Sequence, residues 1–262
     1  MNIFLVLTFL FLLGSVGGFL LEILIRCVFY RKKEKTNLGF LIGPYIPLRG
    51  LSLQIIFLIS IIDFTFIPSA TLQALFEIVI MAVAIIVLEY VVGIIFIKAF
   101  RIKLWDYSDR WGNVQGVICP AYSFLWTSIS ALYYFFLHSQ VIEMVLWFKD
   151  HISLSFFLGV GIGIILIDLV LNLSIAIKVR GFAKKHNIVI RYNRLKSSVI
   201  KYAKDTKQKH NIVTPFSEEL EAKLEYYKAN DYAKEKSTET YDIGTNGDIW
   251  LWKTQQSKVL KK

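Results

Sequence analysis

Acidic, amide and aromatic side chains lie next to long apolar runs in this sequence. Glu89 lies within one such run, in Leu88-Glu89-Tyr90-Val91-Val92-Gly93, and the loop after it carries Asp106 and Asn113. An ionisable residue inside a membrane span is energetically costly and therefore indicates a functional site. We predict a polar site at a membrane boundary. Its predicted substrate-binding residues are Glu22, Arg26, Asn37, Glu89, Trp105, Asp106, Tyr107, Ser108 and Asn113.

These residues also have a structural interpretation. Glu22 and Arg26 are four residues apart, so on a helix they share a face and can form an ion pair. Asp106, Ser108 and Asn113 can hydrogen-bond exposed backbone, as these residue types do in turns. Both interpretations stay open at this point: a substrate site, and structural pairing or capping.

Two other patterns predict helix packing. Asp168 and Asn172 share a face near the middle of the last long apolar run. We expect Asp168 to face the helix bundle rather than lipid and to hydrogen-bond a neighbouring helix. Gly14 and Gly18 have the spacing that allows close helix–helix approach, either within the chain or in a dimer.

The segment from Asn37 to Gly50 is too apolar for an ordinary cytoplasmic loop and too interrupted by glycine and proline for a regular helix. Irregular backbone at membrane depth persists only where it is buried in protein or lines a water-filled cavity. We therefore predict a re-entrant or interfacial segment that leads into the second helix. The residues predicted to shape this segment and the later loop are Gly39, Gly43, Pro44, Pro47, Gly50, Gly116 and Pro120.

The two irregular segments share a spacing. Asn37 precedes Pro44 by seven residues, and Asn113 precedes Pro120 by seven. Each pair follows an apolar run that contains a glutamate and ends in a basic stretch. This pattern favours a parallel repeat of two helix–loop–helix units, an arrangement known among transporters. Chance, or chemistry common to any membrane entry, is the alternative.

Composition predicts the fold class. The chain has 262 residues, of which 55% are hydrophobic, and its mean hydropathy is +0.51. About 20 apolar residues are needed to cross a membrane as a helix. We predict an all-α polytopic membrane protein with about five transmembrane helices, of which the second is the shortest. The five apolar runs lie near residues 3–29, 45–62, 71–97, 116–137 and 153–178.

Charge predicts the orientation. The first and third connections are rich in Lys and Arg, whereas the second, near residues 63–70, has none. The positive-inside rule then places the N-terminus outside and the C-terminus in the cytoplasm of a multi-pass cell-membrane protein. We divide the chain into a transmembrane domain, 1–179, and a basic, partly helical cytoplasmic tail, 180–262. From Lys178 to the end, 19 Lys and Arg stand against 10 Asp and Glu. We expect this tail to meet the anionic inner leaflet, and nucleic acid is not needed to explain the charge.

Several catalytic signatures are missing from the sequence. It contains no G-x-x-x-x-G-K-[ST] phosphate loop, no G-x-S-x-G, no H-E-x-x-H and no cysteine cluster. The two cysteines provide no disulfide framework. The residues therefore predict no metal, no cofactor and no recognised catalytic residue.

At the residues already quoted, the chain resembles a family of bacterial membrane proteins described as type IV ABC-transporter permeases, over about residues 4–175. The resemblance implies transport powered by a separate ATP-binding subunit, and five spans imply a homo-oligomer. One departure is Leu48-Arg49-Gly50, where the family pattern has an aliphatic residue, Tyr and Gly. The motifs are Glu22; Asn37-x-Gly39-Phe40-Leu41-x-Gly43-Pro44 with Pro47 and Gly50; Leu88-Glu89-Tyr90 with Gly93; and Trp105-Asp106-Tyr107-Ser108 with Asn113, Gly116, Ser123 and Trp126.

Three functions follow as hypotheses. The first is a permease-like subunit that moves a small molecule or lipid. The second is a membrane-embedded enzyme that acts on a lipid headgroup, with Asp106 or Glu89 as the acid or base. The third is a scaffold whose tail recruits a cytoplasmic partner.

Overall fold

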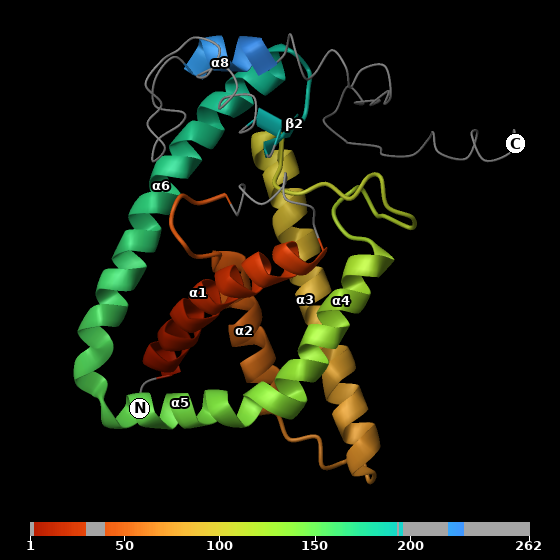
Figure 1. Cartoon of the computed structure of the whole chain (residues 1–262), viewed down its shortest axis with the longest axis vertical. Coiled ribbons are helices and arrows are strands. Elements are labelled where there is room, and N and C mark those ends of the chain that lie inside the picture. The colour runs from red at the N-terminus through yellow and green to blue at the C-terminus, as the bar shows by residue number, and fades with distance from the viewer. Residues whose placement is uncertain (1–2, 30–39, 193, 196–219, 228–262) are drawn as a thin grey trace, which may run out of the picture. The chain divides into compact units, whose positions relative to one another are not determined.

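The computed structural model describes residues 3–29, 40–192, 194–195 and 220–227 (Figure 1). The described part is mainly helical, with two strands of only two residues each, which confirms the all-α prediction. Two compact units divide the chain, Met1–Tyr192 and Asn193–Lys262. In the second unit the described helix is α8 (Leu220–Tyr227), in which Leu224 and Tyr227 are buried. The predicted division after residue 179 stays a prediction.

Four stretches of helix are long and apolar enough to cross a membrane. They match the first, third, fourth and fifth predicted spans. The second predicted span is a shorter helix, α2 (Pro47–Ser60), whose 14 residues reach only about 21 Å. The four long stretches comprise α1 (Ile3–Phe29); α3 (Ala70–Phe100); α4 (Pro120–Leu132), a π-helix (Tyr133–Leu137) and α5 (His138–Asp150); and a 3-10 turn (Ile152–Leu154) with α6 (Ser155–Lys185).

Glycine residues allow α1 and α2 to pack closely against each other (Figure 1). A Cβ on Gly14 would lie 2.7 Å from the Leu53 Cβ, and a Cβ on Gly50 would collide with the Phe11 carbonyl oxygen. Only residues without a side chain let the two backbones approach this closely. The small-residue spacing of Gly14 and Gly18 is therefore used within the chain.

The segment before α2 lies between the middles of two long helices. The Ile46 amide donates to the Ser15 carbonyl of α1 at 2.9 Å, and the Ile42 amide donates to the Asp168 carboxylate of α6 at 3.0 Å. Residues 40–46 are irregular, as predicted, whereas residues 47–50 of the predicted irregular segment already belong to α2, because Pro47 suits the first position of a helix. The Ile42, Gly43 and Ile46 amides have partners in Asp168 and Ser15. Their contacts with mid-helix positions favour the re-entrant interpretation.

Proline begins both inner helices, but not as the repeat predicts. Pro120 is the first residue of α4, and Pro47, rather than Pro44, is the first residue of α2. Proline suits this position because its missing N–H has no helical partner there. The two units therefore share a helix–loop–helix order without sharing the role of the aligned proline, and the internal repeat stays a prediction.

A two-stranded parallel sheet ties the end of α3 to the chain after α6. Strand β1 (Ile102–Lys103) pairs with β2 (Ile190–Arg191), with Lys103 opposite Arg191. Arg101 ends α3 in the left-handed conformation, with φ of 59°. This turn directs the chain from the helix into β1.

Candidate functional site

A partly buried cluster of charges joins α1, α2 and α3. The Arg49 Nη1 atom lies 3.0 Å from the Glu89 Oε1 atom, and Arg49 Nη2 lies 3.7 Å from Glu22 Oε2. The guanidinium also lies 3.7 Å from the centre of the Trp126 ring of α4. Glu89 is only 3% exposed. We call Glu22, Arg49, Glu89 and Trp126 the Arg49 cluster.

Glycines make room for this cluster. A Cβ on Gly18 would collide with the Arg49 side chain, and a Cβ on Gly93 would collide with Val117. Gly18 thus lets Arg49 lie across α1, and Gly93 lets the chain before α4 pack onto α3. Removing such charges from water costs several kcal/mol per ion, a cost that geometry alone seldom recovers. The cluster is therefore a candidate for function.

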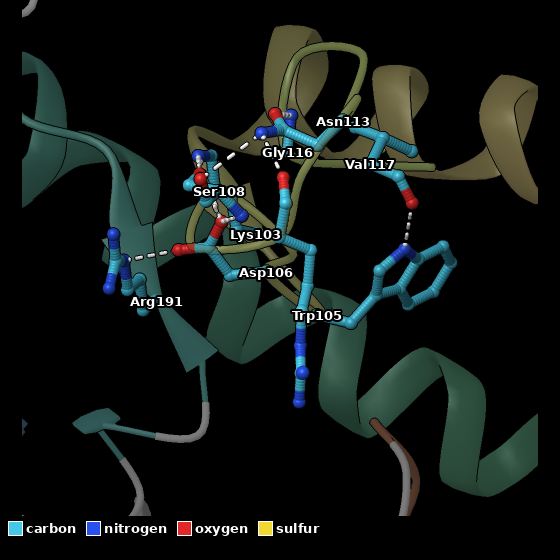
Figure 2. A network of polar contacts seen from close by, with 9 residues as sticks. Lys103, Trp105, Asp106, Ser108, Asn113, Gly116, Val117 and Arg191 are labelled. Carbon is cyan, nitrogen blue, oxygen red and sulfur yellow. Dashed lines mark hydrogen bonds and ion pairs between the residues drawn. The ribbon is translucent and has the colours of Figure 1, made fainter. Parts of the chain in front are cut away.

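A second polar cluster joins the loop between β1 and α4 to one residue each of β1 and β2 (Figure 2). The Arg191 Nε atom lies 2.5 Å from Asp106 Oδ2, and the Lys103 Nζ atom lies 3.3 Å from Asp106 Oδ1 and 3.2 Å from Ser108 Oγ. Lys103 is buried. We call Lys103, Asp106, Ser108 and Arg191 the loop cluster.

The loop cluster fixes the charge of Asp106. Burial raises the pKa of this carboxyl, but Lys103, the hydrogen bonds from Ser108 and Arg191 outweigh burial, so its pKa lies below the usual value. A carboxylate held in this way accepts a proton poorly. This electrostatic setting disfavours Asp106 as the acid or base of a lipid-headgroup enzyme.

Turn hydrogen bonds shape the rest of the loop. The Asn113 side chain donates to the Ser108 carbonyl at 3.1 Å and accepts from the Gly116 amide at 3.0 Å. Trp105 donates to the Val117 carbonyl at 2.9 Å (Figure 2). The capping interpretation of Ser108 and Asn113 thus describes their contacts, while a role in substrate binding stays a prediction.

Gly116 is required at its place in the loop. It adopts φ of +69°, and a Cβ there would lie 2.5 Å from the Ser108 Oγ atom and 2.8 Å from Asp106 Oδ1. Both the backbone conformation and the lack of space therefore favour glycine. The predicted structural role of Gly116 is explained by these contacts.

The predicted site residues divide between the two clusters. Glu22 and Glu89 both pair with Arg49, whereas Asp106 and Ser108 both contact Lys103. Among the residues that the structure describes, no hydrogen bond or ion pair joins the two clusters. Van der Waals packing and the Tyr90–Gln115 hydrogen bond connect α3 to the loop instead.

Other predicted residues lie elsewhere or outside the described part. Tyr107 stacks on Tyr122 with ring centres 4.2 Å apart. Asn37 and Gly39 lie outside the described residues, as does the side chain of Arg26. The proposed Glu22–Arg26 ion pair therefore stays a prediction.

Asp168 anchors the irregular segment to α6. Its carboxylate accepts hydrogen bonds from the Ile42 and Gly43 amides, each at 3.0 Å, and from the Tyr45 hydroxyl at 2.7 Å. Asn172 donates to it at 2.7 Å. Asp168 faces the bundle, as predicted, but its partners are two backbone amides and the Tyr45 hydroxyl of the irregular segment and Asn172 of its own helix, rather than a neighbouring helix.

Sequence reasoning missed Arg49, Lys103 and Arg191 as partners of the predicted acids. Lys103 is three residues from Asp106, a local signal that was available. Arg49 lies 27 positions from Glu22 and 40 from Glu89, and Arg191 lies 85 positions from Asp106, so no local spacing rule connects them. In the part of the chain that the structure describes, no group of three or more His, Cys, Asp or Glu side chains lies together as a metal site requires.

Comparison with known proteins identifies the family. A family model described as "Putative ABC-transporter type IV" matches residues 9–173, which is more than half of the chain. The chain belongs to this family. The match includes the Arg49 cluster, most of the loop cluster and Asp168. With its apolar helices, membership makes this an ABC-transporter-related, multi-pass membrane protein. No curated protein and no solved structure matches the chain.

Proposed function

We propose that the chain is the membrane-spanning permease subunit of an ABC-type transporter that moves a small molecule or lipid. A separate ATP-binding subunit supplies the energy. The Arg49 cluster is the observation that carries this proposal. It holds two carboxylates and a guanidinium among the apolar helices of a member of the "Putative ABC-transporter type IV" family.

The shared guanidinium gives the cluster two ways to pair. Arg49 contacts Glu89 closely at 3.0 Å and Glu22 less closely at 3.7 Å. A small shift of α1 against α3 changes which carboxylate holds it. Charged groups inside membrane helices mark the path of a substrate or ion, and a pairing that differs between two states lets a substrate favour one of them.

The proposed topology keeps five crossings although α2 is short. We place the N-terminus outside and the tail in the cytoplasm, since the basic residues lie in the first and third connections and in the tail. The short α2 crosses one part of the bilayer, and residues 40–46 cross the rest, with the Ile42, Gly43 and Ile46 amides bonded to Asp168 and Ser15. The basic tail meets the anionic leaflet, and a homo-oligomer completes the pathway.

The first test is purification of the full chain from native membranes through a C-terminal tag, followed by mass spectrometry of proteins and lipids. The proposal expects a co-purified protein with a G-x-x-x-x-G-K-[ST] phosphate loop, and no ATP hydrolysis by the chain alone. A preparation that carries no such ATPase but one strongly enriched lipid would contradict the proposal and favour a lipid-modifying enzyme.

The second test is Glu89→Gln, compared with Glu143→Gln as a control. Glu143 is exposed on α5, so the same chemical change there leaves the Arg49 cluster intact. We expect Glu89→Gln to reproduce the uptake phenotype of a deletion strain while the protein keeps its helical content. Normal uptake in the Glu89→Gln strain would refute a transport role for the cluster.

A further inference from the structure

The pairing of Arg49 depends on how two parts of the bundle lie against each other. Arg49 is on α2, which packs closely on α1 through glycine, so Arg49 and Glu22 belong to the same pair of helices. Glu89 belongs to α3, outside this pair. The 3.0 Å contact between Arg49 and Glu89 therefore requires a defined position of the α1–α2 pair against α3. A shift of about 1 Å is enough to break a hydrogen bond of this length.

The irregular segment, residues 40–46, ends in direct contact with the α1–α2 pair. The Ile46 amide donates to the Ser15 carbonyl of α1 at 2.9 Å, and the Ile46 carbonyl accepts from the Arg49 amide, also at 2.9 Å. Ile46 is the N-cap of α2, where its apolar side chain cannot bond the helix. These backbone hydrogen bonds therefore fix the first turn of α2, which carries Arg49.

The middle of the segment is bonded to α6. The Asp168 carboxylate, in a residue only 8% exposed, accepts from two backbone amides of the segment at 3.0 Å and from the Tyr45 hydroxyl at 2.7 Å. Three donors on one buried carboxylate give this attachment a defined geometry, because charge-assisted hydrogen bonds are short and strong. Asp168 thus holds the segment, and through it the start of α2, at a fixed place along α6.

Phe40 joins the segment to α3 and to the loop cluster. Its ring lies edge to face with Phe96 of α3, with ring centres 5.1 Å apart, and its carbonyl accepts from the Tyr192 hydroxyl at 3.1 Å. Tyr192 is buried and directly follows Arg191, which pairs with Asp106. A continuous series of contacts therefore leads from the loop cluster through the segment to Arg49.

We propose that Asp168 and Tyr192 are positioning residues of the Arg49 cluster. By holding residues 40–46, they set the α1–α2 pair against α3 and so determine how firmly Arg49 pairs with Glu89. A change at the loop cluster reaches Arg49 through the same segment, since packed and hydrogen-bonded networks transmit such shifts. This proposal rests on the proposed transport function and adds a route by which an ATP-binding subunit on the cytoplasmic side acts on the transport site.

The test is the coupling between Arg49 and Glu89, measured by reversible SDS unfolding of the full chain in mixed micelles. Arg49→Met, Glu89→Gln and the double variant form a cycle, and the non-additivity of their unfolding equilibrium constants gives the coupling. We expect a coupling of about tenfold or more in the wild-type background, and a fall of about threefold or more in the Asp168→Asn and Tyr192→Phe backgrounds. Tyr134→Phe, the same chemical change on the π-helix, should leave the coupling unchanged, because Tyr134 lies outside the segment and both clusters.

A purely structural role of Asp168 and Tyr192 gives a different result. Stability would then fall in both backgrounds while the Arg49–Glu89 coupling kept its wild-type value, and this outcome would overturn the proposal. If Asp168→Asn fails to fold, Tyr192→Phe alone decides, because it removes one hydroxyl and keeps the ring beside Phe40.

Failure of the positioning proposal is distinct from failure of the proposed function. Unchanged coupling in the Asp168→Asn and Tyr192→Phe backgrounds would overturn the positioning role and leave the Arg49 cluster as it is. Absence of coupling in the wild-type background would overturn both, since Arg49 and Glu89 would then have no pairing to control. The measurement uses the chain alone, so it does not depend on an ATPase.

Discussion

Replacing Arg49 by methionine tests whether the Arg49 cluster is held together by charge. The substitution removes the guanidinium 3.0 Å from the Glu89 carboxylate and leaves that carboxylate 3% exposed without its cation. Leaving one member of a buried ion pair costs about 3–5 kcal/mol. The lost contact with Glu22 adds little, because that side chain is 24% exposed and can be hydrated. Methionine keeps an apolar contact with the Trp126 ring and offsets part of the lost packing.

The double variant Arg49→Met with Glu89→Gln isolates the charge interaction. Removing both charges relieves the unpaired carboxylate, so we expect the double variant to recover about 2 kcal/mol or more relative to Arg49→Met alone. Reversible unfolding of the full chain by SDS in mixed micelles measures these free energies. Arg110→Met is the matched control, since its side chain is exposed in the loop, and it is expected to change stability by about 0.5 kcal/mol or less.

Two results would refute a charge interaction between Arg49 and Glu89. If Arg49→Met costs less than about 1 kcal/mol, the carboxylate does not depend on its partner. If the costs of the two single substitutions simply add in the double variant, the two groups are not coupled. Either result would remove the Arg49 cluster as the basis for a two-state pairing.

Three further predictions concern the loop and the irregular segment. Gly116→Ala should destabilise the protein by about 1–2 kcal/mol in thermal unfolding, because its φ is +69° and space is lacking, whereas Gly159→Ala in an open part of α6 should not. The pKa of Asp106 is lowered in the folded protein, so the stability that this carboxylate contributes should be complete above about pH 5 and be lost as pH falls below about 3.9 toward the folded-state pKa. The difference in unfolding midpoint between wild type and Asp106→Asn should therefore shrink over that range. A constant difference would contradict this prediction. Asp168→Asn should speed hydrogen exchange of the amides at residues 42–43, because an amide side chain has one acceptor oxygen where the carboxylate has two; unchanged exchange would show that the carboxylate does not hold the segment.

Long apolar runs were enough to predict most of the helices. Both ends of α1 and α3, and the start of α6, lie within a few residues of the runs that predicted them. The end of α6 does not. That helix continues to Lys185, because Lys and Arg do not end a helix that leaves the membrane. The predicted span at 45–62 is a shorter helix. The residues before it stay irregular, because Ser15 and Asp168 supply hydrogen-bond partners that their amides would otherwise find within a helix.

The sequence predicted the acidic residues of the candidate site but not the basic residues that pair with them. Glu22 and Glu89 are recognisable because each interrupts an apolar run. Their common partner, Arg49, lies in a separate helix, and only the close packing of α1 and α2 through glycine brings it near.

The anchoring of residues 42 and 43 by Asp168 has a consequence for how the protein is made. The acceptor of these two backbone amides, the Asp168 carboxylate, lies 126 and 125 positions later in the chain and is therefore synthesised after them. At a synthesis rate of about 5–20 residues per second, this delay is roughly 6–25 seconds. During that time the segment has two unsatisfied donors that hydrocarbon cannot accommodate. Insertion must therefore keep this segment in contact with water or with the translocation machinery until the last long helix enters the membrane.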